Sequence, residues 1–298
     1  MPNGKLKSYL LLHLIVFIWG FTGVLGGLIS INGTQLVWYR MLLASGFLFA
    51  WLALTKTSMK LPRKVLLKLT FVGLLIAIHW ILFFTAIKVS NVSITLAMFS
   101  MGAFFAAVFE PLFYNRKMLW YEILFGLVII GALSLILNVE FQHFNGMVLA
   151  LISVFFGVMF TLINGKLTLE YDPKVITLYE FLTGFGFVAI YLLLTGGYSA
   201  EFFVLSGYDW ALILLLASVC TAYAFTASVE VMRRLTPYTV MLTTNLEPVY
   251  GIVLAWFLIG ENERMSTGFY FGAAVIIGVV VLNSIVKNRS DNKKQLDS

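Results

Sequence analysis

The sequence predicts an all-α integral membrane protein, with ten transmembrane helices in two inverted-topology repeats of five. Composition is the first of three observations behind this prediction: 60% of the 298 residues are hydrophobic and only 11% are charged. Soluble domains carry about 25% charged residues, so a soluble fold would leave most of these apolar side chains in water. The recurrence of long apolar stretches and a similarity between the two halves of the chain are the other two observations.

Ten apolar stretches are each long enough to cross a bilayer. A hydrocarbon core about 30 Å thick requires roughly 20 residues of helix at 1.5 Å per residue. The first stretch follows Lys5 and Lys7, but it is too long for the apolar region of a signal peptide and lacks a small-residue cleavage site. No strand-like alternation of the kind found in membrane barrels recurs. The predicted spans are, in chain order, 8–29, 34–54, 69–87, 91–113, 119–138, 146–165, 174–195, 208–228, 236–259 and 266–286.

Basic residues orient each of these spans in turn. From a cytoplasmic N-terminus onward, every second joint is basic, and of the 20 lysines and arginines only Arg40, Lys88 and Arg264 fall in or near the outer half. This asymmetry follows the positive-inside rule, and removing any one span would destroy it. We therefore predict that both termini are cytoplasmic. The net charge of +6 reflects topology and contact with anionic lipid, not nucleic-acid binding.

The two halves of the chain resemble one another. A shift of 146 positions aligns the segment from Ser90 with the segment from Thr236, apolar residue on apolar residue. Each half has five spans, an odd number, so the halves cross the membrane in opposite senses, as in many secondary transporters. The predicted organisation is a first repeat at 1–139, a second repeat at 140–286 and a basic cytoplasmic tail at 287–298.

Several motifs resemble those of the EamA-type drug/metabolite transporters. They are Trp19-Gly20 in the first span, Arg40 early in the second, and NLEPVYGIVLAWFLIGE from Asn245 to Glu261 in the ninth. The resemblance covers essentially the whole chain and implies a ten-helix carrier. Members export amino acids, other metabolites or drugs, and distant relatives exchange sugar phosphates and nucleotide sugars. Glu247 aligns with Met101 in the other repeat, so its role is not duplicated.

An alternating-access carrier holds its substrate near the bilayer midplane, between the repeats. Counting about 1.5 Å per residue from the start of each span brings a set of polar and aromatic residues close to that level, with Tyr223 slightly toward the cytoplasm. We predict that the substrate-binding residues are Trp19, His79, Trp80, Ser100, Met101, Tyr223, Asn245 and Glu247.

Glu247 and His79 are also the predicted proton-coupling residues. A carboxylate at the bilayer centre is costly unless it is paired, hydrated or protonated, and Pro248 leaves the carbonyl oxygen of Thr244 without its helical donor. Glu247 could therefore bind a substrate amine or a proton, or it could hold the kinked helix by a hydrogen bond. An imidazole titrates near neutral pH, although a neutral His79 bonded to a carbonyl is the structural alternative.

The remaining candidates carry similar alternatives. Consecutive helical residues point about 100° apart, so His79 and Trp80 are not both expected to face the centre of one cavity. Met101 could be ordinary helix packing. Arg40 and Glu180 are predicted gate or structural residues; they lie about 12 Å apart in depth, which argues against a direct ion pair.

Nothing in the sequence indicates an enzyme. The single cysteine, Cys220, lies inside a span, and the three histidines lie on different segments. The chain has no Cys/His cluster with metal spacing, no phosphate loop and no nucleophile elbow. No catalytic residue, metal or cofactor is therefore predicted.

The predicted function is the export of a small organic metabolite, an amino acid being one candidate, across a bacterial cytoplasmic (inner) membrane by alternating access. No nucleotide-binding segment exists, so the drive would be the substrate gradient or an ion gradient, most plausibly of protons. An uptake carrier or exchanger of the same fold is the alternative, followed by a membrane-embedded enzyme and a non-transporting scaffold or receptor. The predicted partners are the metabolite, the lipid bilayer and protons; the oligomeric state is open.

Overall fold

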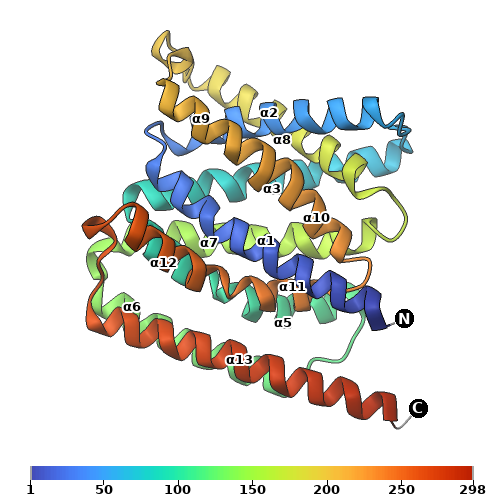
Figure 1. The fold of residues 1–298 in the computed structure, drawn as a ribbon, viewed down its shortest axis with the longest axis vertical. Helices are drawn as coiled ribbons and strands as arrows, with labels where there is room; N and C mark the ends of the chain where they lie inside the picture. Colours follow the sequence, from blue (N-terminus) through green and yellow to red (C-terminus); the bar gives the residue numbers. More distant parts are fainter. Residues whose placement is uncertain (1, 297–298) are drawn as a thin grey trace.

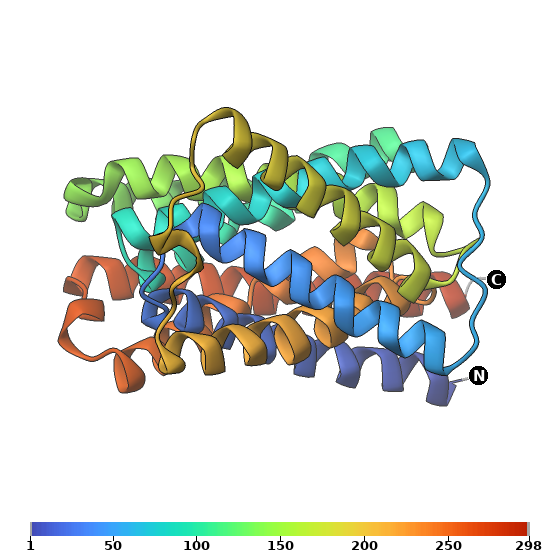
Figure 2. The ribbon, with the colours of Figure 1, turned by 90° about the horizontal axis from the view of Figure 1, so that it is seen from above.

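The computed structural model describes residues 2–296, with side chains described for 4–261, 263–282 and 286. Within this part, the regular secondary structure is entirely helical. Figures 1 and 2 show the helices running side by side along a common direction, as expected for a transmembrane bundle. The predicted all-α membrane fold is confirmed.

Each predicted span corresponds to a helix or to helices in series. In the described residues, nine stretches are long and apolar enough to cross a membrane, and a shorter apolar helix covers Thr267–Leu282. The helices are, in order, α1 (Pro2–Leu28), α2 (Gly33–Leu54), α3 (Arg63–Val89), α4 (Val92–Phe99) with α5 (Met101–Tyr114), α6 (Trp120–Val139), α7 (Phe144–Leu167), α8 (Pro173–Leu194), α9 (Gly207–Leu215) with η3 (Leu216–Tyr223) and α10 (Ala224–Val231), α11 (Pro237–Thr244) with α12 (Glu247–Leu258), and α13 (Thr267–Leu296). Three short 3₁₀ turns lie in the joints: η1 (Phe141–His143), η2 (Glu201–Phe203) and η4 (Glu261–Glu263).

The helix starts follow local capping chemistry. The side chains of Asn32, Asn91, Asp172 and Ser206 each accept a hydrogen bond from a backbone N–H in the first turn of α2, α4, α8 and α9. Such caps satisfy donors that have no partner inside the helix. Helix α3 begins at Arg63, earlier than the predicted 69, because a helix can continue beyond the apolar stretch that crosses the lipid.

The first and last helices have their chain ends on the same side of the bundle (Figures 1 and 2). We call this side the terminal end, and the other the opposite end. Helix α1 begins at the terminal end, whereas α7, the first helix of the second half, begins at the opposite end (Figure 2). The predicted cytoplasmic location of the terminal end stays a prediction. All side chains of the predicted tail at 287–298 lie outside the described residues.

Three spans pack against their counterparts in the other half. Helix α2 contacts α8, α6 contacts α13, and the two fourth spans meet where α5 contacts α11 and α4 contacts α12. Figure 1 shows α6 and α13 together along one edge of the bundle, with α2, α8 and α9 at the other edge. The interior is left to the remaining helices of both halves.

Both halves interrupt their fourth span at corresponding positions. Helix α4 gives way to α5 at Ser100, and α11 gives way to α12 at Asn245 and Leu246. The shift of 146 carries Ser100 onto Leu246, so the two breaks are repeat equivalents. Broken helices in corresponding positions of inverted repeats are typical of transporter binding sites.

The third span of the second half contains a different irregularity. Residues Leu216–Tyr223 form a π-helix between α9 and α10, whereas the equivalent helix α3 is continuous. The Thr221 hydroxyl donates a hydrogen bond to the Leu216 carbonyl oxygen, five residues earlier, at 2.6 Å. Segments of π-helix often occur at functional sites.

Helices α1 and α12 cross at very short range. A Cβ atom on Gly20 would lie 2.9 Å from the Gly251 backbone nitrogen and 3.1 Å from the Glu247 carbonyl oxygen. Glycine at this crossing allows backbone-to-backbone contact. The crossing fixes Glu247 and the neighbouring Trp19 at one level of the bundle.

Candidate functional site: a polar cavity between the two repeats

A cavity of about 80 Å³ lies inside the bundle. Each repeat supplies side chains from four helices: α1, α2, α3 and α4 from the first, and α7, α10, α11 and α12 from the second. No described residue of α6 or α13 lines it. The cavity therefore occupies the interface between the repeats, next to the broken helices.

Arg40 is the buried cation of this cavity. Its side chain is 2% exposed, and its Nε donates a hydrogen bond to the Thr221 hydroxyl at 2.6 Å. The guanidinium carbon lies 3.8 Å from the centroid of the Trp80 ring, a cation–π contact. Nη1 has no hydrogen-bond partner in the described part of the chain, so the guanidinium retains an unused donor.

Glu247 supplies an acidic group to the cavity. It begins α12 directly after the second break, lies 5% exposed and lines the cavity. Its carboxyl group interacts electrostatically with Arg40 but forms no ion pair at contact distance with the side chains that the structure describes. The cavity thus holds a cation and an acidic group that do not contact each other directly.

His79 is fixed by one neighbour. Its Nδ1 lies 2.8 Å from the Ser153 carbonyl oxygen, and the Ser153 hydroxyl donates to the His79 carbonyl oxygen at 2.7 Å. A carbonyl oxygen only accepts, so Nδ1 carries the proton and Nε2 remains available as an acceptor. Gly157 makes room for the ring, because a Cβ atom there would lie 3.1 Å from its Cε1.

The predicted site residues divide into three groups. Trp19, His79, Trp80, Glu247 and the predicted gate residue Arg40 line the cavity. Three further predicted residues are buried at the helix breaks without lining the cavity: Ser100, Met101 and Asn245. Two lie elsewhere: Tyr223, whose side chain is 47% exposed, and Glu180, which is fully buried behind the cavity wall beside Asn164.

Helices α7, α10 and α11 contribute lining residues that were not predicted from the sequence, and those of α7 share one face. Gly157, Phe160, Thr161 and Asn164 all line the cavity. Their spacing of three and four residues marks one face of a helix. The polar residues Thr161 and Asn164 at this spacing, within an otherwise apolar span, were the available signal in the sequence. Position along the span did not by itself distinguish them from their neighbours.

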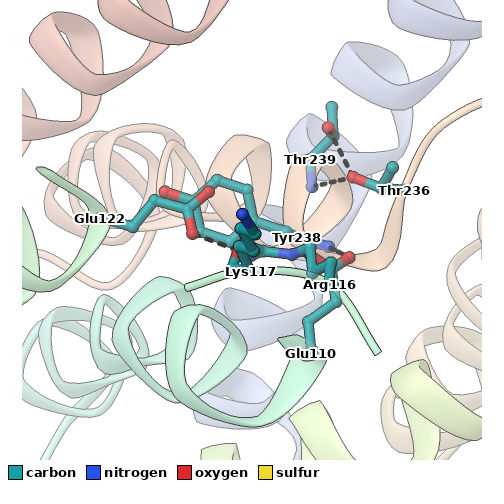
Figure 3. A network of polar contacts seen from close by, with 7 residues as sticks. All are labelled: Glu110, Arg116, Lys117, Glu122, Thr236, Tyr238 and Thr239. Atoms are coloured by element: carbon teal, nitrogen blue, oxygen red, sulfur yellow. Dashed lines mark hydrogen bonds and ion pairs between the residues drawn. The ribbon is translucent and has the colours of Figure 1, made fainter. Parts of the chain in front are cut away.

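A network of charged side chains joins the repeats at the terminal end (Figure 3). Glu110 of α5 accepts a hydrogen bond from the Tyr238 backbone N–H, at the start of α11, at 2.9 Å. Arg116 bridges Glu110 at 2.7 Å and Glu122 at 2.8 Å. Partial burial works to lower the pKa of Arg116, but the two carboxylates outweigh it and hold that pKa above its ordinary value. Arg116 therefore stays charged at physiological pH.

A second carboxylate joins the repeats at the opposite end. Glu263 accepts hydrogen bonds from the backbone N–H groups of Val92 and Ser93, both at 2.9 Å, and from the Ser93 hydroxyl at 2.8 Å. These donors form the first turn of α4, where a negative charge is favoured. Gly260, with φ of +88°, turns the chain after α12 and brings Glu263 to this position.

Comparisons with known proteins agree with this architecture. The EamA-like transporter family matches twice, over residues 6–138 and 144–285. An uncharacterized transporter of Archaeoglobus fulgidus is 24% identical over 289 residues, which cover 93% of this chain and 97% of that protein. A protein of known crystal structure has the same fold, with a TM-score of 0.72 at 13% identity over 95% of this chain and 98% of that one. The chain is a member of the EamA-like transporter family.

Proposed function

We propose that this membrane transporter exports a small organic metabolite across the cytoplasmic membrane by alternating access. The observation that carries the proposal is the cavity between the repeats, lined by four helices from each. The adjacent breaks in α4/α5 and α11/α12 support it, because a binding site in inverted-repeat carriers is built at such breaks. The predicted bacterial inner membrane and cytoplasmic termini belong to the same proposal.

The cavity chemistry favours a small molecule that carries both charges, and an amino acid has that character. Arg40 Nη1 has no partner among the described residues and can donate to a carboxylate. The Glu247 carboxyl group forms no ion pair with those residues and can bind an amine. Trp19, Trp80 and Phe160 provide aromatic surface between them. A purely apolar substrate would leave the Arg40 charge without a partner, which is costly within the membrane.

Efflux from proteoliposomes tests the function. Purified protein is reconstituted, the vesicles are loaded with a panel of amino acids and other small metabolites, and release is measured with and without an imposed pH gradient. Protein-dependent release of at least one charged compound is expected. The direction of the pH gradient that release requires distinguishes export from uptake. Release that occurs only when substrate is also present outside the vesicles identifies an exchanger. No movement of any compound by folded protein would contradict the transport proposal.

Glu247→Gln tests whether Glu247 takes part in proton coupling. The glutamine keeps the shape of the side chain but cannot release a proton, so transport by this variant should lose its dependence on the pH gradient. Glu170→Gln is the matched control, because Glu170 is exposed in a joint. If Glu247→Gln retains the pH dependence of the unaltered protein, Glu247 is not a coupling residue.

A further inference from the structure

The Glu180 carboxyl group forms no ion pair with a cation among the described residues. The side chain is fully buried, and its single hydrogen bond runs from Asn164 Nδ2 to Oε2 at 3.4 Å. The other carboxyl oxygen, Oε1, has no partner among the described residues. An ionised carboxylate in this position would lack both solvent and a counter-charge, which membrane interiors tolerate poorly.

The ionisable groups on the helices around Glu180 do not neutralise it. None forms an ion pair or a hydrogen bond with Glu180 in the described part of the chain. Helix α8 packs against α2, α3 and α10, and Asn164 belongs to α7. The ionisable residues on these four helices are Tyr39, Arg40, Arg63, Lys64, Lys68, His79, Lys88, Lys166 and Glu230.

The atoms left without partners identify what is missing. Asn164 Oδ1 is buried and unpartnered, like Glu180 Oε1. Two acceptor oxygens cannot bond to each other, but a protonated carboxyl group can donate from one oxygen and accept on the other. A proton on Oε1 would let Glu180 donate to Asn164 Oδ1 while Asn164 Nδ2 donates to Oε2, which gives both orphaned oxygens a partner.

We propose that Glu180 and Asn164 form a proton-binding pair that exchanges its proton through the cavity. Asn164 lines the cavity whereas Glu180 does not, so the amide separates the carboxyl group from the cavity. When the cavity widens and admits water, the Oε1–H bond breaks, a cavity water takes the proton, and the carboxylate keeps the electron pair. In the compact structure Glu180 is fully buried, and the proton stays on it.

Coupling of this proton to substrate movement rests on the proposed transport function, whereas the presence of the proton does not. Infrared spectroscopy of the reconstituted protein detects a protonated carboxylic acid directly by its carbonyl stretch. We expect such a band at pH 7, its loss of amplitude in Glu180→Gln, and a frequency shift in Asn164→Leu, which removes the hydrogen-bond partner. Glu230→Gln, at a half-exposed carboxyl group paired with Arg233, should leave the band unchanged, and Glu247→Gln separates any contribution from Glu247.

Two results would overturn the proposal. One is an infrared spectrum in which the carboxylic acid carbonyl band is the same in Glu180→Gln and in the unaltered protein, since Glu180 would then be ionised. The other concerns the cation of the buffer. If the band disappears when a choline buffer is replaced by a sodium buffer at the same pH, the pair binds sodium in place of the proton. If Glu180→Gln does not fold, the shift in Asn164→Leu decides. For any compound that the unaltered protein transports, Glu180→Gln should reduce gradient-driven transport to background. If the unaltered protein transports no compound, the transport proposal is contradicted, but the infrared result still tests the proton on Glu180.

Discussion

Arg40 lies in a setting that depends on the shape of its side chain as well as its charge. The planar guanidinium covers the Trp80 ring while Nε reaches the Thr221 hydroxyl. Lysine has a point charge on a flexible stem and cannot make both contacts in this way. Thr221 itself is presented by the π-helix, because its hydroxyl spans five residues to Leu216.

Arg40→Lys should therefore destabilise the protein although it conserves charge. We expect a loss of about 1–3 kcal/mol, typical for a buried polar group that loses its partner, measured as a lower thermal unfolding midpoint in detergent. Arg63→Lys, at an exposed position, is the control and should change little. Equal midpoints for the two variants would show that the planar contacts of Arg40 do not contribute to stability.

At the scale of the helix, Gly20 should be intolerant of any side chain. A methyl group there would meet the Gly251 backbone within 2.9 Å, so Gly20→Ala must push α1 away from α12. Overpacking of this kind costs about 1–3 kcal/mol, and the change also moves Glu247. The prediction is a lower unfolding midpoint and weaker transport.

Gly46→Ala is the matched control for Gly20→Ala. Nothing lies within 4 Å of a Cβ atom at Gly46, and alanine favours a helix over glycine by about 1 kcal/mol. This control should therefore be neutral or slightly stabilising. A Gly20→Ala protein as stable as Gly46→Ala would mean that the α1–α12 crossing can relax without cost.

The sequence was sufficient for the helices because their lengths follow from lipid thickness. It did not show the break at Ser100 or the π-helix at 216–223, since no proline lies at either position. Only Pro248 marked a possible irregularity, at the second break. Counting depth placed Trp19, His79 and Glu247 at the level where they line the cavity, but depth carries no information about rotation around the helix, which decides where Asn245 and Tyr223 point.

At the scale of the whole molecule, each repeat holds the other at one end. Glu110 of the first repeat caps α11 of the second at the terminal end, and Glu263 of the second caps α4 of the first at the opposite end. These residues are not repeat equivalents under the shift of 146. The two contacts can therefore differ in strength, and the terminal one has the additional bridge through Arg116.

Removing either cap should open the end that it joins. In a Cys220→Ser background with Val240→Cys in the cavity wall, a membrane-impermeant maleimide applied to one side reports access from that side. Glu263→Gln should increase labelling from the opposite end severalfold, and Glu110→Gln should increase it from the terminal end, because a neutral amide holds a helix N-terminus less well. Arg116 titrates far above neutral pH, so its bridge should not make labelling vary between pH 6 and 8.

Glu201→Gln at the opposite end and Glu170→Gln at the terminal end are controls for the labelling experiment, because both residues are exposed in joints. Neither should change the rate on either side. If the two cap variants raise labelling from the same side, the caps hold the bundle together without controlling which end opens.

Helices α6 and α13 pack together at the edge of the bundle and supply no described residue to the cavity. Different segments of the chain therefore face the lipid and line the cavity. Divergence among relatives within α6 and α13 should follow the membrane in which each one resides. Divergence along α7 and around the two breaks should follow the molecule that each one carries, so those positions are the ones from which specificity can be compared between species.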